Sequence, residues 1–203
     1  MNSRRKLILL LAIIALPLVA VRAQAPANQS TAVDPALLAK ANAGDASAQL
    51  QVADAFAQGN GAARDSRQLR ADYSQAAFWY RKAAEQGNTA AQTHLADLYR
   101  DGRGVTRDMA QAIDLYRKAA NLGDAGAQGT LGLLYSVGMG VQQDYVEAYY
   151  WLDLAAAVKG PNQARYITNR QSIGEHITTE EQTAVEDRVA AWKATHPRPG
   201  SSE

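Results

Sequence analysis

The three histidines, His94, His176 and His196, are the side chains of this chain best suited to metal binding or acid–base chemistry. They show no zinc-ligand spacing such as His-Glu-x-x-His. The chain has no cysteine, which excludes thiol nucleophiles, thiolate ligands and disulfides, and no Gly-x-Ser-x-Gly element marks a serine nucleophile. The sequence therefore predicts a protein without catalytic residues, cofactor or metal, and not an enzyme.

Three aspartates follow one another at equal intervals of 36 residues: Asp72, Asp108 and Asp144. Three carboxylates could in principle share a metal ion. Each, however, stands where a helix is expected to begin, and an aspartate there caps the helix and favours its positive N-terminal dipole. Caps on successive helices cannot share one ion, because neighbouring helix axes lie at least about 8–10 Å apart. We interpret these aspartates as helix caps.

A Gly-x-Gly element recurs three times, at Gly59-Gly61, Gly102-Gly104 and Gly138-Gly140. A phosphate-binding loop needs a preceding strand and a Gly-Lys-Ser/Thr ending, and neither is present. Glycine permits the positive φ angles that stop a helix and reverse the chain. The element therefore predicts a turn between two helices.

The elements that position these residues repeat with a period of 36. The residues of one unit return 36 and 72 positions later: Ala76, Trp79, Tyr80, Ala83 and Ala84; then Ala112, Leu115, Tyr116, Ala119 and Ala120; then Ala148, Trp151, Leu152, Ala155 and Ala156. Self-similarity at this period is typical of helical repeat arrays, whose units bury their apolar faces by stacking on their neighbours. Because the aromatic residues of this set recur, we assign them to the core.

Each unit reads as two helices, A and B. Helix A starts at an Ala-Gln pair, and in the second unit Ala91, Leu95, Leu98 and Tyr99 fall on one face. One helix A position stays small in all three units, as Ala53, Ala96 and Gly132, which permits close helix packing. Helix B is expected to begin near the capping aspartates and to end at Gly87, Gly123 and Gly160.

Half-units are expected at both ends of the array. Residues 35–43 read as a degenerate helix B that begins at the cap Asp34, and residues 162–172 as a final helix A. Thr179 to Gln182 resembles a capping box. It predicts a terminal helix with Val185, Val189 and Trp192 on its packing side, covering the end of the array.

The first unit contains seven extra residues near 62–71, in a stretch that carries Arg64, Arg67 and Arg70. Insertions in repeat proteins often lie on the binding face. A solvated surface loop is the alternative.

The N-terminus has the pattern of a secretory signal peptide. Arg4, Arg5 and Lys6 precede the apolar stretch 7–20, and we expect cleavage after Ala23. An uncleaved anchor is the alternative, although the apolar run is shorter than the roughly 20 residues of a spanning helix. Without its first 23 residues the chain keeps 17 basic and 20 acidic residues, a balance that argues against a nucleic-acid partner.

The repeats and their flanking segments predict the following organisation: signal peptide 1–23, flexible leader 24–33, N-terminal half-repeat 34–47, repeat 1 at 48–90, repeat 2 at 91–126, repeat 3 at 127–163, C-terminal half-repeat and capping helix 164–195, and tail 196–203.

Taken in order, the Ala-Gln pair, Leu-(Gly/Ala)-x-Leu-Tyr, Gly-x-Gly-Val, Asp-x-x-x-Ala and Trp/Leu-Tyr-Arg-Lys-Ala-Ala resemble the Sel-1-like repeat, a relative of the tetratricopeptide repeat. The stretch from Ala91 to Asp124 is the best copy. The resemblance implies an all-α, right-handed α/α solenoid that serves as a scaffold or adaptor in protein complexes. One secreted subgroup of the family is rich in cysteine; this chain departs from it, so β-lactamase-like activity is not transferred.

The surface formed by successive A helices is the candidate binding site. Equivalent outward positions hold residues that vary between repeats: Gln51, His94 and Thr130, and one turn later Asp54, Asp97 and Leu133. Together with the three arginines of the insertion they form the candidate site for a protein or peptide partner. We expect a periplasmic or secreted adaptor of the bacterial cell envelope with no membrane span after cleavage. A cell-wall hydrolase or a ligand-sensing regulator remains the alternative.

Overall fold

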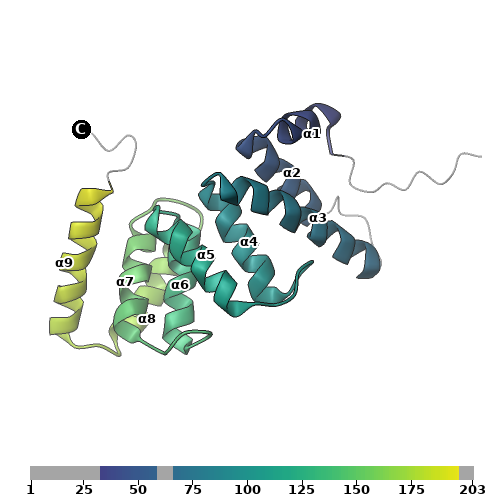
Figure 1. The fold of residues 1–203 in the computed structure, drawn as a ribbon. Coiled ribbons are helices and arrows are strands. Elements are labelled where there is room, and N and C mark those ends of the chain that lie inside the picture. Colours follow the sequence, from purple (N-terminus) through teal and green to yellow (C-terminus); the bar gives the residue numbers. More distant parts are fainter. Residues whose placement is uncertain (1–32, 59–65, 197–203) are drawn as a thin grey trace, which may run out of the picture. The chain divides into compact units, whose positions relative to one another are not determined.

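The described part of the computed structural model, residues 33–58 and 66–196, is built from α-helices and contains no strand (Figure 1). These residues all belong to one compact unit, Thr31–Glu203. Arg64 and the expected signal peptide lie outside the described residues. The helices in chain order are α1 Pro35–Asn42, α2 Ala46–Gln58, α3 Ser66–Glu85, α4 Thr89–Asp101, α5 Met109–Asn121, α6 Ala125–Val137, α7 Tyr145–Ala156, α8 Gln163–Gly174 and α9 Thr179–Thr195.

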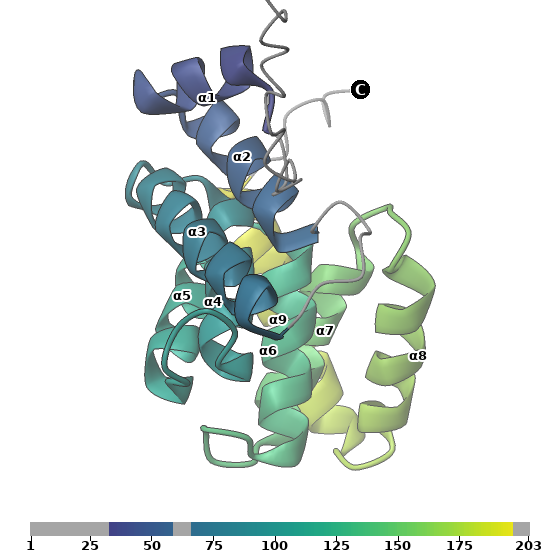
Figure 2. The same ribbon diagram turned by 90° about the vertical axis from the view of Figure 1, so that its right-hand side faces the viewer.

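Each helix packs against the next one along the chain from α1 to α8, and α9 packs against α7. Helices α2, α4 and α6 are the A helices of the three repeats, and α3, α5 and α7 are the B helices. Figure 2 shows α8 and α9 on different sides of α7. Apart from the α7–α9 contact, the main contacts join helices that are neighbours in the sequence, as in a solenoid, in which every repeat completes the core of the previous one. The predicted all-α solenoid is confirmed.

The small helix A positions allow the B helices to approach closely. Ala53 and Ala96 are completely buried. At the third position, a Cβ on Gly132 would lie 2.6 Å from Leu152 Cγ. A larger side chain at any of these places would separate two packed helices.

The glutamine of each Ala-Gln pair forms a hydrogen bond with the backbone of the preceding helix. In each repeat the glutamine side-chain nitrogen donates a hydrogen bond to the carbonyl eight residues earlier, near the end of the preceding helix. These bonds are Gln49 to Ala41 at 3.0 Å, Gln92 to Ala84 at 3.3 Å and Gln128 to Ala120 at 3.0 Å. Each of these carbonyls, near a helix end, also accepts a backbone N–H from the following turn, that of Gly44, Gly87 or Gly123, so the glutamine supplies a second hydrogen bond.

Two of the three predicted aspartate caps are confirmed. Asp108 accepts a hydrogen bond from the backbone N–H of Gln111, and Asp144 accepts one from Glu147. Gly102 and Gly138 end the A helices in the left-handed region, with φ of 68° and 70°.

The expectation for Asp72 is wrong. Helix α3 begins at Ser66, so Asp72 lies inside the helix and is only 6% exposed. Helix α3 has 20 residues and α5 has 13, which means that the insertion lengthens helix B. The inserted Arg, Gln, Leu and Ala residues are good helix formers, and an existing helix is extended more easily than a new one is nucleated. Arg67 and Arg70 are therefore helical residues, not loop residues.

Two further helix boundaries differ from the expectation. The last B helix, α7, ends at Ala156, before Gly160. The capping box of α9 starts one residue earlier than predicted: Thr178 accepts from the Glu181 N–H, and the Glu181 side chain accepts from the Thr178 N–H. The terminal helix itself is confirmed, with Val185 and Val189 buried.

Candidate functional site

Two neighbouring pockets, both open to solvent, lie on the first two repeats. We name them after one lining residue each. The Asp54 pocket, of about 270 Å³, is lined by Asp54, Ala57, Gln58, Tyr73, Tyr80, His94, Asp97, Leu98 and Arg103. The Arg70 pocket, of about 720 Å³, is lined by Leu69, Arg70, Tyr73, Ser74, Gly102, Arg103, Gly104, Val105 and Thr106. Tyr73 and Arg103 line both pockets, so the two pockets adjoin, and we refer to the pair of pockets as the groove.

Side chains from three helices meet at Asp54. The Tyr80 hydroxyl of α3 donates a hydrogen bond to Asp54 Oδ1 of α2 at 2.7 Å. His94 Nε2 of α4 lies 3.9 Å from the same oxygen, and its ring lies over Tyr80 with 5.3 Å between ring centroids. Burial, reinforced by the Asp54 carboxylate, raises the pKa of Tyr80 well above its usual range. Tyr80 therefore stays a neutral donor that fixes the carboxylate.

The second carboxylate of this pocket, Asp97, has a cationic partner. Its Oδ1 accepts a hydrogen bond from the Tyr116 hydroxyl at 2.6 Å and lies 3.0 Å from Arg100 Nη1. Arg100 also pairs with Asp101, at 2.7 Å, and its hydrogen bond lowers the pKa of that carboxyl. Asp97 and Asp101 thus share a bound arginine, whereas the cationic partner of Asp54 among the described residues is His94 alone, which is charged only when protonated.

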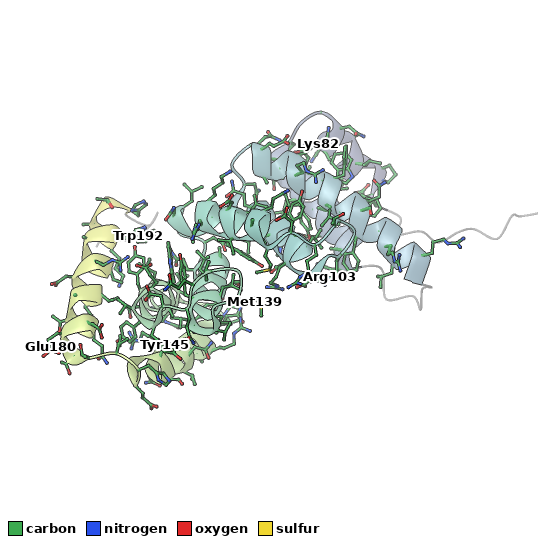
Figure 3. The ribbon with its side chains drawn as sticks, turned by 60° about the horizontal axis from the view of Figure 1, so that its bottom comes forward. Lys82, Arg103, Met139, Tyr145, Glu180 and Trp192 are labelled. Carbon is green, nitrogen blue, oxygen red and sulfur yellow. The ribbon has the colours of Figure 1, made fainter. Side chains whose placement is uncertain are left out.

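The wall shared by the two pockets is a cation–π pair. The Arg103 guanidinium lies 5.2 Å from the centroid of the Tyr73 ring, and its Nη1 donates to the Tyr73 hydroxyl at 3.4 Å. Figure 3 shows Arg103 near the end of α4, beside α3. Arg103 Nη2 also pairs with Asp101 at 2.6 Å, so the wall is held from both repeats.

The turn after α4 is clamped onto α3. Ser74 Oγ donates a hydrogen bond to the Gly104 carbonyl at 2.9 Å. Gly104 has φ of 71°, and a Cβ built on it would lie 2.2 Å from the carbonyl carbon of Tyr73. Only glycine allows this approach, which sets the position of the neighbouring Arg103.

The Arg70 pocket carries positive charge, whereas the Asp54 pocket carries negative charge. Arg70 is exposed on α3 and forms no ion pair with any residue that the structure describes. None of the described lining residues of this pocket is a carboxylate, and Leu69 beside Arg70 is 43% exposed. The groove is therefore anionic at Asp54 and cationic at Arg70.

The structure brings only part of the predicted site together. Asp54, His94 and Asp97 line the Asp54 pocket, and Arg70 lines the adjoining one. The others lie elsewhere: Gln51 is exposed and contacts Ser47, Arg67 is exposed on α3, and Thr130 and Leu133 lie on α6 outside the groove. Their participation in binding stays a prediction.

Two residues of the groove, Tyr73 and Arg103, were not predicted from the sequence. Arg103 is the middle residue of Gly-Arg-Gly in repeat 2, where repeat 3 has Met139. This variation inside an otherwise constant turn was the available signal. Tyr73 follows Asp72. Because Asp72 was expected to cap the helix, Tyr73 was expected in its first turn, whereas it lies inside the longer helix α3.

Two structural features are absent from the described residues. No group of three or more His, Asp or Glu side chains there is close enough to hold a metal ion. In the same residues, no helix combines the length and the apolar character needed to cross a membrane.

Among the solved structures that resemble this chain in fold, two are compared with it. One is c5321, described as a protective antigen present in uropathogenic Escherichia coli strains displaying an SLR fold, with 24% identity and a TM-score of 0.58 over 82% of this chain and 44% of that one. The other is a Sel1 repeat protein from Oxalobacter formigenes, with 31% identity and a TM-score of 0.53 over 63% of this chain and 47% of that one. The chain spans less than half the length of either structure. None of the curated proteins compared with it matches.

The Sel1 repeat family model matches three consecutive segments, 46–88, 89–124 and 125–157. These segments contain the helix pairs α2–α3, α4–α5 and α6–α7. Sel1 repeats generally mediate protein–protein interaction, and proteins built from them are typically non-enzymatic scaffolds. The chain therefore belongs to the Sel1 repeat family.

Proposed function

We propose that this protein is an exported adaptor that binds a peptide segment of another protein in the bacterial cell envelope through the groove of repeats 1 and 2. The single observation behind the proposal is the groove, whose two adjoining pockets are lined by charged and aromatic side chains from α2, α3, α4 and the turn after α4. Export is supported by the sequence pattern before Ala23.

The groove side chains are held in place before any partner arrives. The Tyr80 hydroxyl fixes Asp54, and Tyr73 together with Asp101 fixes Arg103. A site whose side chains are already ordered loses little conformational entropy on binding, so more of the contact energy remains as affinity. This favours recognition of a short segment over a large flat contact.

The test is photo-crosslinking in intact cells. A photoreactive amino acid replaces Ala57 in the Asp54 pocket or Thr106 in the Arg70 pocket, and a matched control replaces Asp114, which is exposed on α5 outside the groove. We expect a discrete protein adduct from the two groove positions and none from position 114. Equal labelling from all three positions, or no protein adduct, would contradict adaptor function at this groove.

Export is tested separately by fractionation of the same cells. The proposal requires a processed chain that lacks about 23 residues outside the cytoplasm. A chain of unprocessed mass that stays in the cytoplasm would contradict the envelope location without affecting the crosslinking result.

A further inference from the structure

We infer that the groove selects peptide segments that carry one cationic and one anionic side chain, with the cation against Asp54 and the anion against Arg70. This inference rests on the proposed function and specifies the chemistry of its partner. It comes from the opposite charges of the Asp54 pocket and the Arg70 pocket, which share the Tyr73–Arg103 wall.

The cationic group is assigned by the surroundings of Asp54. Its Oδ1 is used by Tyr80 and faces His94, while its Oδ2 accepts no hydrogen bond from any described residue. The carboxylate side chain is 33% exposed, so it is partly screened from water yet reachable. A partner ammonium or guanidinium group can pair with Oδ2 as a charge-assisted hydrogen bond.

The walls of the Asp54 pocket suit the stem of a lysine or arginine as well as its charge. Ala57 and Leu98 are apolar lining residues, against which methylene groups can pack.

The pocket keeps a net attraction for a cation although Arg103 lines it. The charge of Arg103 is paired with Asp101, and Arg100 pairs with both Asp97 and Asp101. These four residues largely neutralise one another. Within the part of the chain that the structure describes, Asp54 is left as the carboxylate of this pocket without a permanent cationic partner.

The anionic group is assigned by Arg70. Since Arg103 is already paired, Arg70 is the available positive charge among the described lining residues of its pocket. Its guanidinium can bind a carboxylate through two parallel hydrogen bonds. Leu69 and Val105 add apolar surface beside it, and the exposed hydroxyl of Thr106 lies on the same lining.

Because the two pockets share the Tyr73–Arg103 wall, the order of the cationic and the anionic side chain along a peptide segment decides whether the segment binds. A segment that lies along the Tyr73–Arg103 wall reaches both pockets at once. In the reverse orientation its anion faces Asp54 and its cation faces Arg70, and like charges repel at both ends. Selectivity of this kind depends on repulsion of the wrong arrangement as much as on attraction of the right one.

The experiment is a selection from a phage-displayed library of random twelve-residue peptides on the purified full chain. The same library is selected on the charge-reversed variant D54K, R70E. We expect the native protein to enrich peptides with a basic and an acidic residue in one preferred order. The charge-reversed variant should enrich the opposite order.

Enriched peptides are then synthesised with a fluorescent label, and their binding is measured by fluorescence anisotropy. Asp54→Asn keeps an acceptor oxygen for Tyr80 and removes the charge, and it should weaken binding about tenfold. Arg70→Gln should weaken it about threefold to tenfold. Asp114→Asn and Lys118→Gln, both exposed on α5, are the matched controls and should leave affinity unchanged.

The outcomes separate the two proposals. If the protein enriches no peptide, both this inference and peptide binding itself are wrong. If it enriches peptides that crosslink to the groove yet lack a charge pair, or bind Asp54→Asn and Arg70→Gln as tightly as the native chain, only this inference is overturned. Circular dichroism of Asp54→Asn and Arg70→Gln must match the native chain, and these two variants decide the question if D54K, R70E does not fold.

Discussion

The Tyr116 hydroxyl, on helix B of repeat 2, donates a hydrogen bond at 2.6 Å to Asp97 Oδ1, on helix A of the same repeat. Repeat 1 contains the same contact between Tyr80 and Asp54, at 2.7 Å. In both repeats the tyrosine is buried, and its hydroxyl holds an aspartate whose side chain is about one third exposed. These carboxylates are therefore oriented by the core.

Repeat 3 replaces both partners of this contact. Thirty-six positions after Asp97 and Tyr116 the chain has Leu133 and Leu152. Leu152 is fully buried, and Leu133 is 40% exposed. The joint loss of donor and acceptor avoids a buried hydroxyl without a partner, which would be unfavourable. It also makes the surface of repeat 3 less polar than that of repeats 1 and 2.

Removing one of these hydroxyls should destabilise the fold. Tyr116→Phe deletes the donor to Asp97, and we expect the free energy of unfolding to fall by about 1–2 kcal/mol. Tyr145→Phe is the control, because its hydroxyl accepts only an exposed hydrogen bond from Gln143. Urea unfolding followed by circular dichroism measures both. An equal effect of the two substitutions would contradict a structural role for the Tyr116–Asp97 bond.

The repeat glutamines should contribute through their buried backbone bond. Gln128 is 1% exposed and donates to the Ala120 carbonyl. Gln128→Leu removes one of the two hydrogen bonds to that carbonyl, which also accepts from the Gly123 N–H at 3.0 Å, and this loss should cost about 0.5–1.5 kcal/mol. Gln142→Leu, on an exposed turn, serves as the comparison and should change stability by less than about 0.5 kcal/mol. Thermal and urea unfolding together test the prediction, and a stable Gln128→Leu variant would refute it.

Gly104 should tolerate alanine less well than another glycine with positive φ. Gly104→Ala meets both an unfavourable backbone angle and a clash with Tyr73, whereas Gly87→Ala, at φ of 83°, has no atom within 4 Å of the new Cβ. We expect about 1 kcal/mol of destabilisation for Gly87→Ala and clearly more for Gly104→Ala. Because the turn carries Arg103, Gly104→Ala should also weaken peptide binding. Similar unfolding midpoints for the two variants would argue against the clamp between this turn and α3.

Alkaline pH should unfold the protein through its buried tyrosines. Burial raises the pKa of Tyr80 and Tyr116 above the usual range. The stabilisation from a raised pKa is fully present below the unfolded-state value of about 10 and is lost as pH rises above it. The free energy of unfolding should therefore fall above about pH 10, and less steeply in the Tyr80→Phe, Tyr116→Phe variant.

The measurement combines tyrosinate absorbance with circular dichroism during a base titration. Two tyrosines should ionise only together with the loss of helix signal. Ionisation of all tyrosines before unfolding would show that these hydroxyls are not protected in the native state.

Much of the fold could be predicted because the same local signals for helix start, helix end and packing recur every 36 residues. Asp108 caps a helix, Gly102 ends one, and Ala96 is a small buried residue at a helix contact. Each of these features depends on only a few neighbouring residues. The prediction failed at Asp72. The same residue type stands there at the same interval, but the preceding inserted residues are themselves helix formers, so the helix starts earlier.

The candidate site was predicted only in part. The outward position of Asp54, His94 and Asp97 follows from the helical period. Their participation in one pocket with Tyr73 and Arg103 does not follow from any local pattern. A period specifies which face each helix buries, but not which exposed side chains of different helices come within reach.

By itself, then, the sequence determined the repeat, the helix pairs and the buried face of each helix, because these depend on short-range propensity and on the apolar period. The tertiary structure alone decided the groove. The lengthened α3 carries Leu69 and Arg70 to the turn around Gly104, and the stacking of α2, α3 and α4 brings Asp54, Tyr80 and His94 together. Distances between helices are set by the packing of side chains far apart in the chain, so the opposite charges of the groove became visible only in the folded protein.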